Sequence, residues 1–269
     1  MGTFSADWLA LRERYDLRAR SPVVLEAVTS FFARRTSIRI VDLACGTGST
    51  LRALTSRLPA RQSWTLIDHD AGLLARAAST PTEGDIAVAV MPLDLNHDLE
   101  AALAGTVDLI VISALLDLVS EGWLNSLAAA LTARAIPFYA ALSYDGRVAF
   151  MPPDPFDAAI INAVNAHQHT DKGFGPALGP AAAHVAPACF EAHGYAVIAG
   201  ASDWVMGPAD RDIQTELLHG WASAAQDIGA LSADDIAAWL TRRRSMIADG
   251  CSSSLVGHVD FFAVPSATR

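Results

Sequence analysis

The chain has 269 residues, of which 52% are hydrophobic and 18% charged, and its formal net charge is −10 at pH 7. This composition excludes an intrinsically disordered chain, and the length is enough for one sizeable domain with a full hydrophobic core. Because a net negative charge repels a phosphate backbone, a nucleic-acid substrate is disfavoured, although a local basic groove stays open as an alternative.

The cysteines and the N-terminal stretch indicate the cellular compartment in which we expect the protein. Cys45, Cys189 and Cys251 form no CxxC pair and share no zinc-like spacing with histidines, so no metal is expected and a reducing compartment fits best. The N-terminal stretch carries charges where a signal peptide has its apolar core, and no apolar run approaches the ~18 residues of a membrane span. We expect a soluble cytoplasmic protein with no membrane partner, either a monomer or a homodimer.

Two helical patterns open the chain. Ser5 is suited to cap the first, in which Trp8 and Tyr15 follow at helical spacing, and Pro22 suits the first turn of the second. Residues 1–35 are therefore expected to form an N-terminal helical cap.

A regular alternation of strands and helices follows. Short, apolar, β-branched segments predict strands at about 38–43, 63–68, 86–91, 107–113 and 136–144. Helices are expected between them, near 49–58, 70–79, 98–104 and 120–134. Continuous hydrophobic strands separated by helices indicate a parallel sheet that is covered on both faces.

The alternation changes after the fifth strand, where the Asp145-Gly146 pair predicts a hairpin turn. The later segments read as a helix within 151–180, a helix near 181–193, a strand near 195–205, helices near 210–229 and 232–249, and a last strand. This order predicts a three-layer α/β fold of the Rossmann-like kind, with a seven-stranded sheet whose last strand is antiparallel. We expect a single domain over residues 1–269, with 151–180 and 207–250 as helical insertions over the active site.

The segment VDLACGTGST follows the first predicted strand. A dinucleotide-binding turn needs a third glycine where this chain has Leu51, and a phosphate-binding P-loop needs a Gly-Lys-Ser/Thr that is missing. Small residues such as Gly46 and Gly48 let a backbone lie flat against a ligand. Asp42 would repel a pyrophosphate but suits a ligand with an ammonium and a sulfonium group, which is S-adenosylmethionine.

Acids also follow the next two predicted strands. Asp68 ends the second strand within LIDHDAGLL, where a carboxylate can accept both hydroxyls of a ribose; capping of the next helix is a compatible role. The third strand runs into MPLDL, where Asp94 can accept from an adenine amino group and Leu95 can donate its backbone N–H. A solvated loop acid is the alternative for Asp94. Acids after three successive strands favour one shared nucleoside site.

With these motifs the chain resembles the class I S-adenosylmethionine-dependent methyltransferases over essentially its whole length. VDLACGTGS, LIDHDAGLL and MPLDL are similar to their first three motifs, and YDLRARSPVVLEAV resembles the helices that precede the first motif in small-molecule members. The resemblance implies S-adenosyl-L-methionine as cofactor and methyl transfer to oxygen, nitrogen or carbon of a small molecule. The cofactor contacts that we expect are Arg20, Asp42, Ala44, Cys45, Gly46, Gly48, Asp68, His69, Asp94, Leu95 and Ser113.

Methyl transfer from a sulfonium is an in-line displacement that needs a general base only for a hydroxyl or a protonated amine. The predicted helix within FDAAIINAVNAHQHTDKGFG carries a polar stripe, where His169 is the first candidate for a base. His167 is the second, although its place on the apolar face favours a buried histidine. Asp117, Asn165 and Lys172 are the candidates for substrate contact, and a solvated helix face is the alternative for the whole stripe.

Three further aromatic residues, Tyr144, Trp204 and Trp221, are candidates for a wall of the substrate site, although single aromatics more often belong to a core. We expect a small-molecule substrate and no nucleic-acid partner. A nucleic-acid or protein methyltransferase of the same fold would instead show a basic groove across the carboxyl edge of the sheet. A non-catalytic S-adenosylmethionine-binding module would lack a cleft beside the methyl group.

Overall fold

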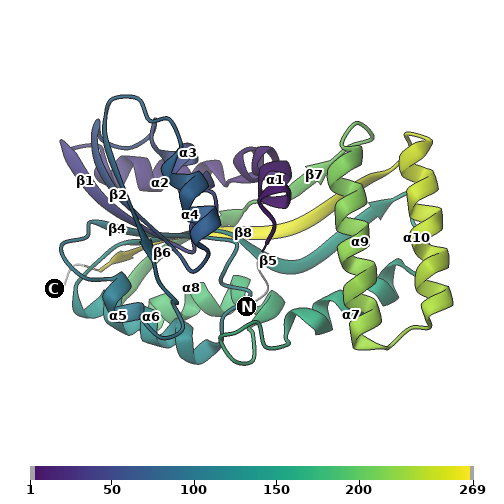
Figure 1. Ribbon diagram of the computed structural model, residues 1–269. Helices are drawn as coiled ribbons and strands as arrows, with labels where there is room; N and C mark the ends of the chain where they lie inside the picture. Colours follow the sequence, from purple (N-terminus) through teal and green to yellow (C-terminus); the bar gives the residue numbers. More distant parts are fainter. Residues whose placement is uncertain (1–3, 267–269) are drawn as a thin grey trace.

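An eight-stranded sheet is the frame of the protein, shown in Figure 1 for a computed structural model that describes residues 4–266. Its strands are β1 (Ser37–Leu43), β2 (Arg61–Asp68), β3 (Asp85–Pro92), β4 (Leu109–Ser113), β5 (Phe138–Met151), β6 (Tyr195–Ala201), β7 (Trp204–Met206) and β8 (Ser253–Pro265). The strand order is β3-β2-β1-β4-β5-β8-β6, and β7 also pairs with β8.

The pairing confirms the predicted Rossmann-like sheet. Strands β1 to β5 pair in parallel, and β8 is antiparallel to both β5 and β6. The eighth strand arises because the single strand expected near 195–205 is interrupted at Ser202 and Asp203, so that β6 and β7 follow one another along β8. The carboxyl ends of the parallel strands meet at one edge, where open α/β sheets bind ligands.

Helices cover both faces of the sheet. They are α1 (Ala6–Ala19), α2 (Pro22–Phe32), α3 (Ser49–Leu54), α4 (Ala71–Ala78), α5 (Leu99–Ala102), α6 (Glu121–Ala133), α7 (Asp157–Gln168), the short 3-10 helix η1 (Gly179–Ala181), α8 (Ala182–Ala192), α9 (Arg211–Ile228) and α10 (Ala233–Ala248). Ser5 caps α1 as predicted, because its hydroxyl accepts from Trp8 N at 3.1 Å. Over residues 4–266, no helix combines the length and the apolar character that crossing a bilayer requires.

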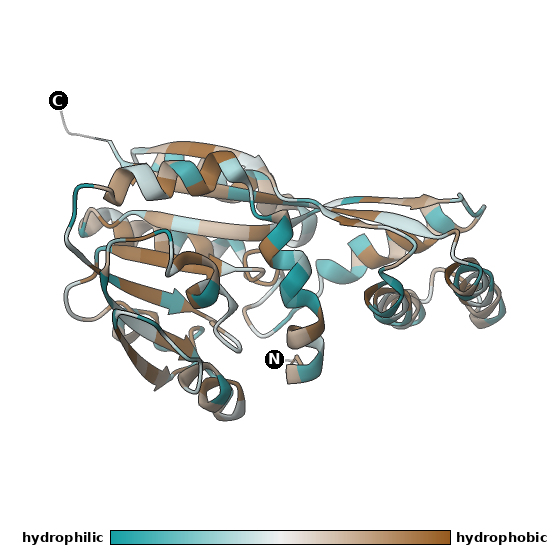
Figure 2. Cartoon of the chain, turned by 90° about the horizontal axis from the view of Figure 1, so that it is seen from above, coloured by the Kyte–Doolittle hydropathy of each residue, from teal (hydrophilic) through white to brown (hydrophobic). Residues whose placement is uncertain are grey.

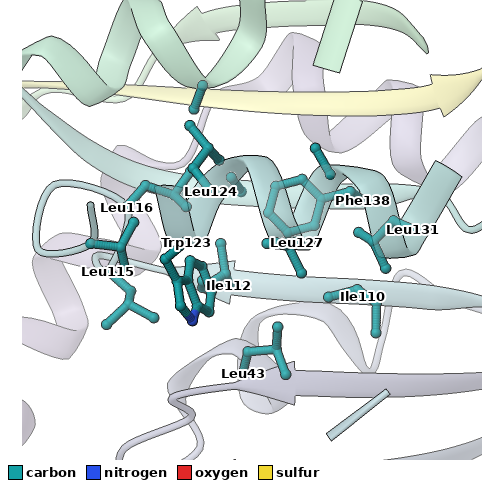
Figure 3. Packing of buried hydrophobic residues seen from close by; sticks show 14 of the residues in the cluster. Leu43, Ile110, Ile112, Leu115, Leu116, Trp123, Leu124, Leu127, Leu131 and Phe138 are labelled. Atoms are coloured by element: carbon teal, nitrogen blue, oxygen red, sulfur yellow. The ribbon is translucent and has the colours of Figure 1, made fainter. Parts of the chain in front are cut away.

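Alternate side chains of the strands point to opposite faces and build two cores. On one face Leu43 and Ile112 pack with Leu124 and Leu127 of α6 (Figure 3). On the other face lies a cluster that includes Ile40, Trp64 and, from α2, Val28 and Phe32. Because the parallel strands are buried on both faces, they read in the sequence as continuous apolar runs.

Strands β5 and β8 extend beyond the parallel strands β1 to β4 as a ribbon, and β7 pairs with the extended part of β8. Figures 1 and 2 show α7, α9 and α10 gathered on this extension, away from β1 to β3. A third apolar cluster joins the ribbon to these helices and includes Phe150, Ile160 and Trp239. The helical insertions expected from the sequence therefore share a core of their own.

The predicted hairpin at Asp145-Gly146 is wrong. Strand β5 continues through both residues, and its pairing with β8 shifts register between Tyr144 and Val148. Gly146 has a φ of 85°, and a Cβ at this position would meet the ring of Pro180 at 2.9 Å. The pair forms an irregularity within the strand because β8 offers a partner on both sides of it, so the chain does not turn back.

Candidate functional site

A glycine turn, residues 44–48, leads from β1 into α3 at the carboxyl edge of the sheet. Ala44, Gly46 and Gly48 all have left-handed backbone conformations, with φ of 56°, 54° and 83°. The turn is tied to β2, because Gly46 N donates to Asp68 Oδ2 at 2.9 Å. A hydrogen bond within the turn also stabilises it, because Gly48 N donates to Cys45 O at 2.9 Å. The small residues therefore serve a fixed, tightly curved backbone.

Asp68 occupies the end of β2, facing this turn. Its other carboxylate oxygen, Oδ1, accepts from Asp70 N at 3.0 Å and lies 3.3 Å from His69 Nδ1. The cap of α4 is Asp70, which accepts from Gly72 N and Leu73 N, so the suggested capping role of Asp68 is wrong. A carboxylate has about four lone-pair sites, so Asp68 keeps capacity for hydroxyl donors.

Behind the turn lie a carboxylate and a guanidinium with unused hydrogen-bonding capacity. Asp42 is 1% exposed and neither of its oxygens has a partner among the described residues; burial raises the pKa of this carboxyl to about 8. Arg20 donates to Tyr139 Oη at 3.1 Å and to Thr50 Oγ1 at 3.3 Å, while its Nε has no partner in residues 4–266.

A cavity of about 90 Å³ lies beside the glycine turn and is here called the turn cavity. The predicted cofactor residues that line it are Ala44, Cys45, Gly46, Asp68, His69 and Ser113. Leu9, Arg12 and Asp16 close it from α1, and Thr50 lies at its inner side. Gly48, Asp42 and Arg20 are not in the lining; Gly48 begins α3, and Asp42 and Arg20 stand behind. Burial raises the pKa of the Cys45 thiol, as expected for a filler of the turn and not a nucleophile.

A smaller hollow of about 20 Å³ continues the turn cavity toward β3. It shares Ala44, Asp68 and His69 with the turn cavity and is also lined by Asp94 and Leu95. The Asp94 carboxylate accepts from Asn96 N at 2.9 Å, which lowers the pKa of this acid. Two of the three strand-end acids thus face a shared hollow.

A larger cavity of about 410 Å³, here called the outer cavity, borders the turn cavity; both are lined by Phe4, Arg12, Ala114 and Leu118. The three aromatic residues named from the sequence all line it, together with Trp8. The charged, amide and histidine side chains of its lining come from α1, α7, α9, β8 and the connection after β4, and are Arg12, Asp117, Gln168, Glu216, His219 and His258.

Asp117 is a buried carboxylate in the wall of the outer cavity. It is 6% exposed, and its Oδ1 has no hydrogen-bond partner among the described residues. Burial raises the pKa of Asp117 to about 6, opposed by its own backbone N–H and by the charges of Arg12 and Lys172. Asp117 therefore lines a cavity, and its contact with a substrate stays a prediction.

The two other candidates for substrate contact do not line either cavity. Asn165 accepts from Tyr144 Oη at 2.7 Å and donates to Gly146 O at 3.2 Å, so it holds an aromatic ring of the outer cavity in position. Lys172 donates to Thr170 Oγ1 at 2.8 Å. Asn165 therefore acts on the cavity indirectly, through Tyr144.

The two histidines named as candidate bases are not brought to either cavity. His169 Nδ1 lies 3.3 Å from Ala177 O, packed against the loop before η1. His167 lies 3.5 Å from Asp227 and 3.3 Å from Lys172 Nζ; burial first, and Lys172 second, lowers its pKa. Because α7 turns this part of its polar stripe toward α9 and the loop, the geometry gives a base role for either residue no support.

Sequence reasoning missed most of the polar lining of the outer cavity, including Arg12 and His258. Arg12 makes a two-pronged ion pair with Asp16, at 3.0 and 3.1 Å, and its guanidinium lies 4.9 Å from the centre of the Trp204 ring. His258 of β8 has Nδ1 3.1 Å from Val256 O, and burial lowers its pKa to about 3, so the ring is neutral. Arg12 lies within the first predicted helix, but a helical pattern gives no reason to link it to Trp204 of β7, about 190 residues later. No feature of the neighbouring sequence distinguishes His258.

Comparison with known proteins agrees with this geometry. Residues 40–135, from β1 to the end of α6, match the family model described as a methyltransferase domain. A search of the curated proteins gives no match. Among solved structures, a cyclopropane-fatty-acyl-phospholipid synthase-like protein from Lactobacillus casei has 13% identity and a TM-score of 0.54, over 96% of this chain and 94% of that chain. At this identity the likeness shows a shared fold.

Two further similar structures have lower scores. A mycolic acid cyclopropane synthase complexed with SAH and CTAB has 12% identity and a TM-score of 0.48, over 95% of both chains. A SAM-dependent methyltransferase from Thiobacillus denitrificans, in complex with S-adenosyl-L-homocysteine, has 14% identity and a TM-score of 0.42, over 98% of this chain and 100% of that chain. Residues 40–135 therefore match a methyltransferase domain, and the strand order is that of a Rossmann-like sheet.

Proposed function

We propose that the protein methylates a small molecule that is held in the outer cavity, with S-adenosylmethionine bound at the glycine turn. The observation that carries this proposal is the contact between the two cavities, which share Phe4, Arg12, Ala114 and Leu118. An acceptor in the outer cavity would therefore lie directly beside a ligand at the turn. Holding the acceptor close to the methyl carbon and in line with the carbon–sulfur bond is the main task of such an enzyme.

The residues around the turn suit the cofactor chemically. The unpartnered Asp42 carboxylate and Arg20 Nε match the ammonium and the carboxylate of a methionine group, through the turn or through water. Asp68 is proposed to hold the ribose, and Asp94 with Leu95 the adenine. When bound, the cofactor supplies a methyl group on a positively charged sulfur that is already a good leaving group.

The lining of the outer cavity favours a small molecule over a macromolecule. Its acids are Asp117 and Glu216, and its one arginine is neutralised by Asp16. A nucleic acid would need a basic surface, which these groups do not offer. A cavity of about 410 Å³ also lies in the range of small-molecule sites, so a non-catalytic binding module is the weaker reading.

The insertions are proposed to cap this site. Val164 and Gln168 of α7, and Leu217 and Trp221 of α9, line the outer cavity. No residue of α10 is among the lining of the two cavities, so we assign α10 to the support of α9.

Calorimetry with S-adenosylhomocysteine tests the cofactor site. The expected result is binding by the wild-type protein and a loss of at least about 100-fold in affinity for Asp68→Ala, which corresponds to about 2.7 kcal/mol. Because Asp68 also holds the backbone N–H groups of Gly46 and Asp70, this variant should melt at a lower temperature as well.

The matched control is Asp70→Ala, which removes only the cap of α4. It should cost about 1 kcal/mol of stability and leave S-adenosylhomocysteine affinity within twofold of wild type. Equal affinities of wild type and Asp68→Ala would remove Asp68 from the site, and no binding by wild type would refute the proposed function.

A further inference from the structure

The wall of the outer cavity contains a buried carboxylate, Asp117, with one oxygen that has no hydrogen-bond partner among the described residues. Asp117 is 6% exposed, and its Oδ1 makes no hydrogen bond among residues 4–266. Leaving a buried charged oxygen without a donor costs free energy, which a bound donor can recover. A ligand that brings an N–H donor with a positive charge recovers the most, since charge-assisted hydrogen bonds are about twice as strong as neutral ones.

The cations near Asp117 have other partners. Arg12, in the same cavity wall, forms its two-pronged ion pair with Asp16 and lies over the Trp204 ring. Lys172 donates to Thr170 and lies outside the cavity lining. Glu216 adds a second acid on the exposed side of α9, and in the described part of the chain it takes part in no ion pair. The unpaired charge of this cavity is therefore negative.

Aromatic rings form much of the remaining wall. Trp8, Tyr144, Trp204 and Trp221 all line the cavity. Two of the rings are fixed by hydrogen bonds: Tyr144 Oη donates to Asn165 at 2.7 Å, and Trp204 Nε1 donates to Asp16 at 3.1 Å. Fixed aromatic faces around a free carboxylate favour a cation through both charge pairing and cation–π attraction, and they accept a flat apolar body.

We propose that the methyl acceptor is an amine carried on an apolar body of one or two rings, with its nitrogen beside Asp117 and its rings among the aromatic side chains. This inference rests on the proposed function, because it assigns the acceptor of the same reaction. Leu118, the next residue after Asp117, lines both cavities, so we place the amine at the border between them. A carboxylate ligand would be repelled, and an alcohol would bring the hydrogen bond without the charge.

The chemistry balances with an amine. An ammonium first loses one proton to water at the exposed mouth near Glu216 and His219. The nitrogen lone pair then forms the new nitrogen–carbon bond, while the carbon–sulfur bond breaks and its electrons stay on the sulfur. Positive charge develops on the nitrogen in this step, and the Asp117 carboxylate stabilises it.

The test is calorimetry on the protein saturated with S-adenosylhomocysteine, so that binding is read without turnover. The probes are matched pairs: 2-phenylethylamine with 2-phenylethanol, and tryptamine with its alcohol tryptophol, with 3-phenylpropionate as the anion. We expect at least one amine to bind tenfold or more tightly than its alcohol, and the anion not to bind. Asp117→Asn should abolish the preference for the amine, whereas Glu121→Gln, which changes an exposed carboxylate in the first turn of α6, should preserve it.

The possible failures are distinguishable. If S-adenosylhomocysteine binds and neither amine exceeds its alcohol, the amine inference is overturned while the proposed function stands. If Asp117→Asn keeps the full preference for the amine, Asp117 is not the recognition group and the inference is likewise overturned. If S-adenosylhomocysteine itself does not bind, the proposed function fails and the inference fails with it.

Discussion

At the scale of the residue, the least expected feature is a carboxyl group at the end of β1 that the protein leaves without a donor. Asp42 is fully enclosed, and burial raises its pKa from 3.8 to about 8, with Asp68 acting in the same direction and Arg20 in the opposite one. A cation bound on the turn side would favour the ionised form of Asp42, whereas in the empty site the carboxyl keeps its proton up to about pH 8.

Asp42→Asn tests this raised pKa through the pH dependence of stability. Between about pH 4 and pH 8 the folded protein retains a proton on Asp42 that the unfolded chain has released, so the free energy of unfolding falls as pH rises through this window. The variant lacks this titration. We expect its melting temperature, relative to wild type, to rise progressively from pH 5 to pH 8.

Thermal melts of both proteins across this range make the comparison. Asp117, whose pKa is also raised, contributes a similar slope in both proteins and cancels in the difference. Parallel curves for the two proteins would show that Asp42 titrates normally in the folded state.

At the scale of the element, helix α1 controls the space at the glycine turn. A Cβ built on Gly46 would lie 3.2 Å from Leu9 Cδ1, and both Leu9 and Phe4 line the turn cavity of about 90 Å³. Small-molecule sites usually offer 300 Å³ or more, so a nucleoside needs the beginning of α1 to move. The end of the helix is better anchored, because Tyr15 donates to Asp210 at 2.8 Å and Asp16 accepts from Trp204.

Hydrogen–deuterium exchange tests this movement. With S-adenosylhomocysteine, the amides of residues 6–12 should exchange more slowly than in the free protein, because the first turns of α1 then pack on the ligand. The amides of residues 14–19 and of α2 should change little and serve as the internal control. Exchange that is unaltered in 6–12 while calorimetry reports binding would show that the turn cavity admits the ligand without α1.

At the scale of the whole molecule, the β5–β8 ribbon joins the end that contains the glycine turn to a helical end, and each end has its own core. The helical end contains Arg243, which is fully buried. It pairs with Asp157, donates to Pro152 O at 2.7 Å, and lies 4.3 Å from the centre of the Phe150 ring. These contacts tie α10 to the start of α7 and to the ribbon.

Arg243→Ala should therefore destabilise the protein by about 3 kcal/mol, since it removes a fully buried cation and leaves the partly exposed Asp157 carboxylate without its ion-pair partner. The exposed neighbour Arg244→Ala is the matched control and should stay within about 0.5 kcal/mol of wild type. Urea unfolding measures both variants. At urea concentrations below the unfolding transition, both variants should bind S-adenosylhomocysteine with wild-type affinity. A loss of affinity in Arg243→Ala would mean that the two ends of the molecule are coupled.

The predictions from sequence succeeded wherever the signal is local. The bounds of α6 and α9 were predicted to within one or two residues because Ser120 caps the first and Gly229 ends the second with a left-handed backbone. The prediction of a hairpin at Asp145-Gly146 was wrong because the same dipeptide occurs both in turns and in strand irregularities. Which of the two forms here depends on pairing with β8, more than 100 residues later.

By itself, the sequence determined the alternating α/β order, the glycine turn and the acids that follow three strands, because helix periodicity, strand burial and turn chemistry act over a few neighbouring residues. Only the tertiary structure decided what faces the outer cavity. Its walls come from α1, β5, α7, β7, α9, β8 and the connection after β4, whose side chains meet through long-range pairing that no local pattern encodes. For this reason the sequence did not predict that His258 lines the cavity, while His169, the C-cap of α7, packs against a loop.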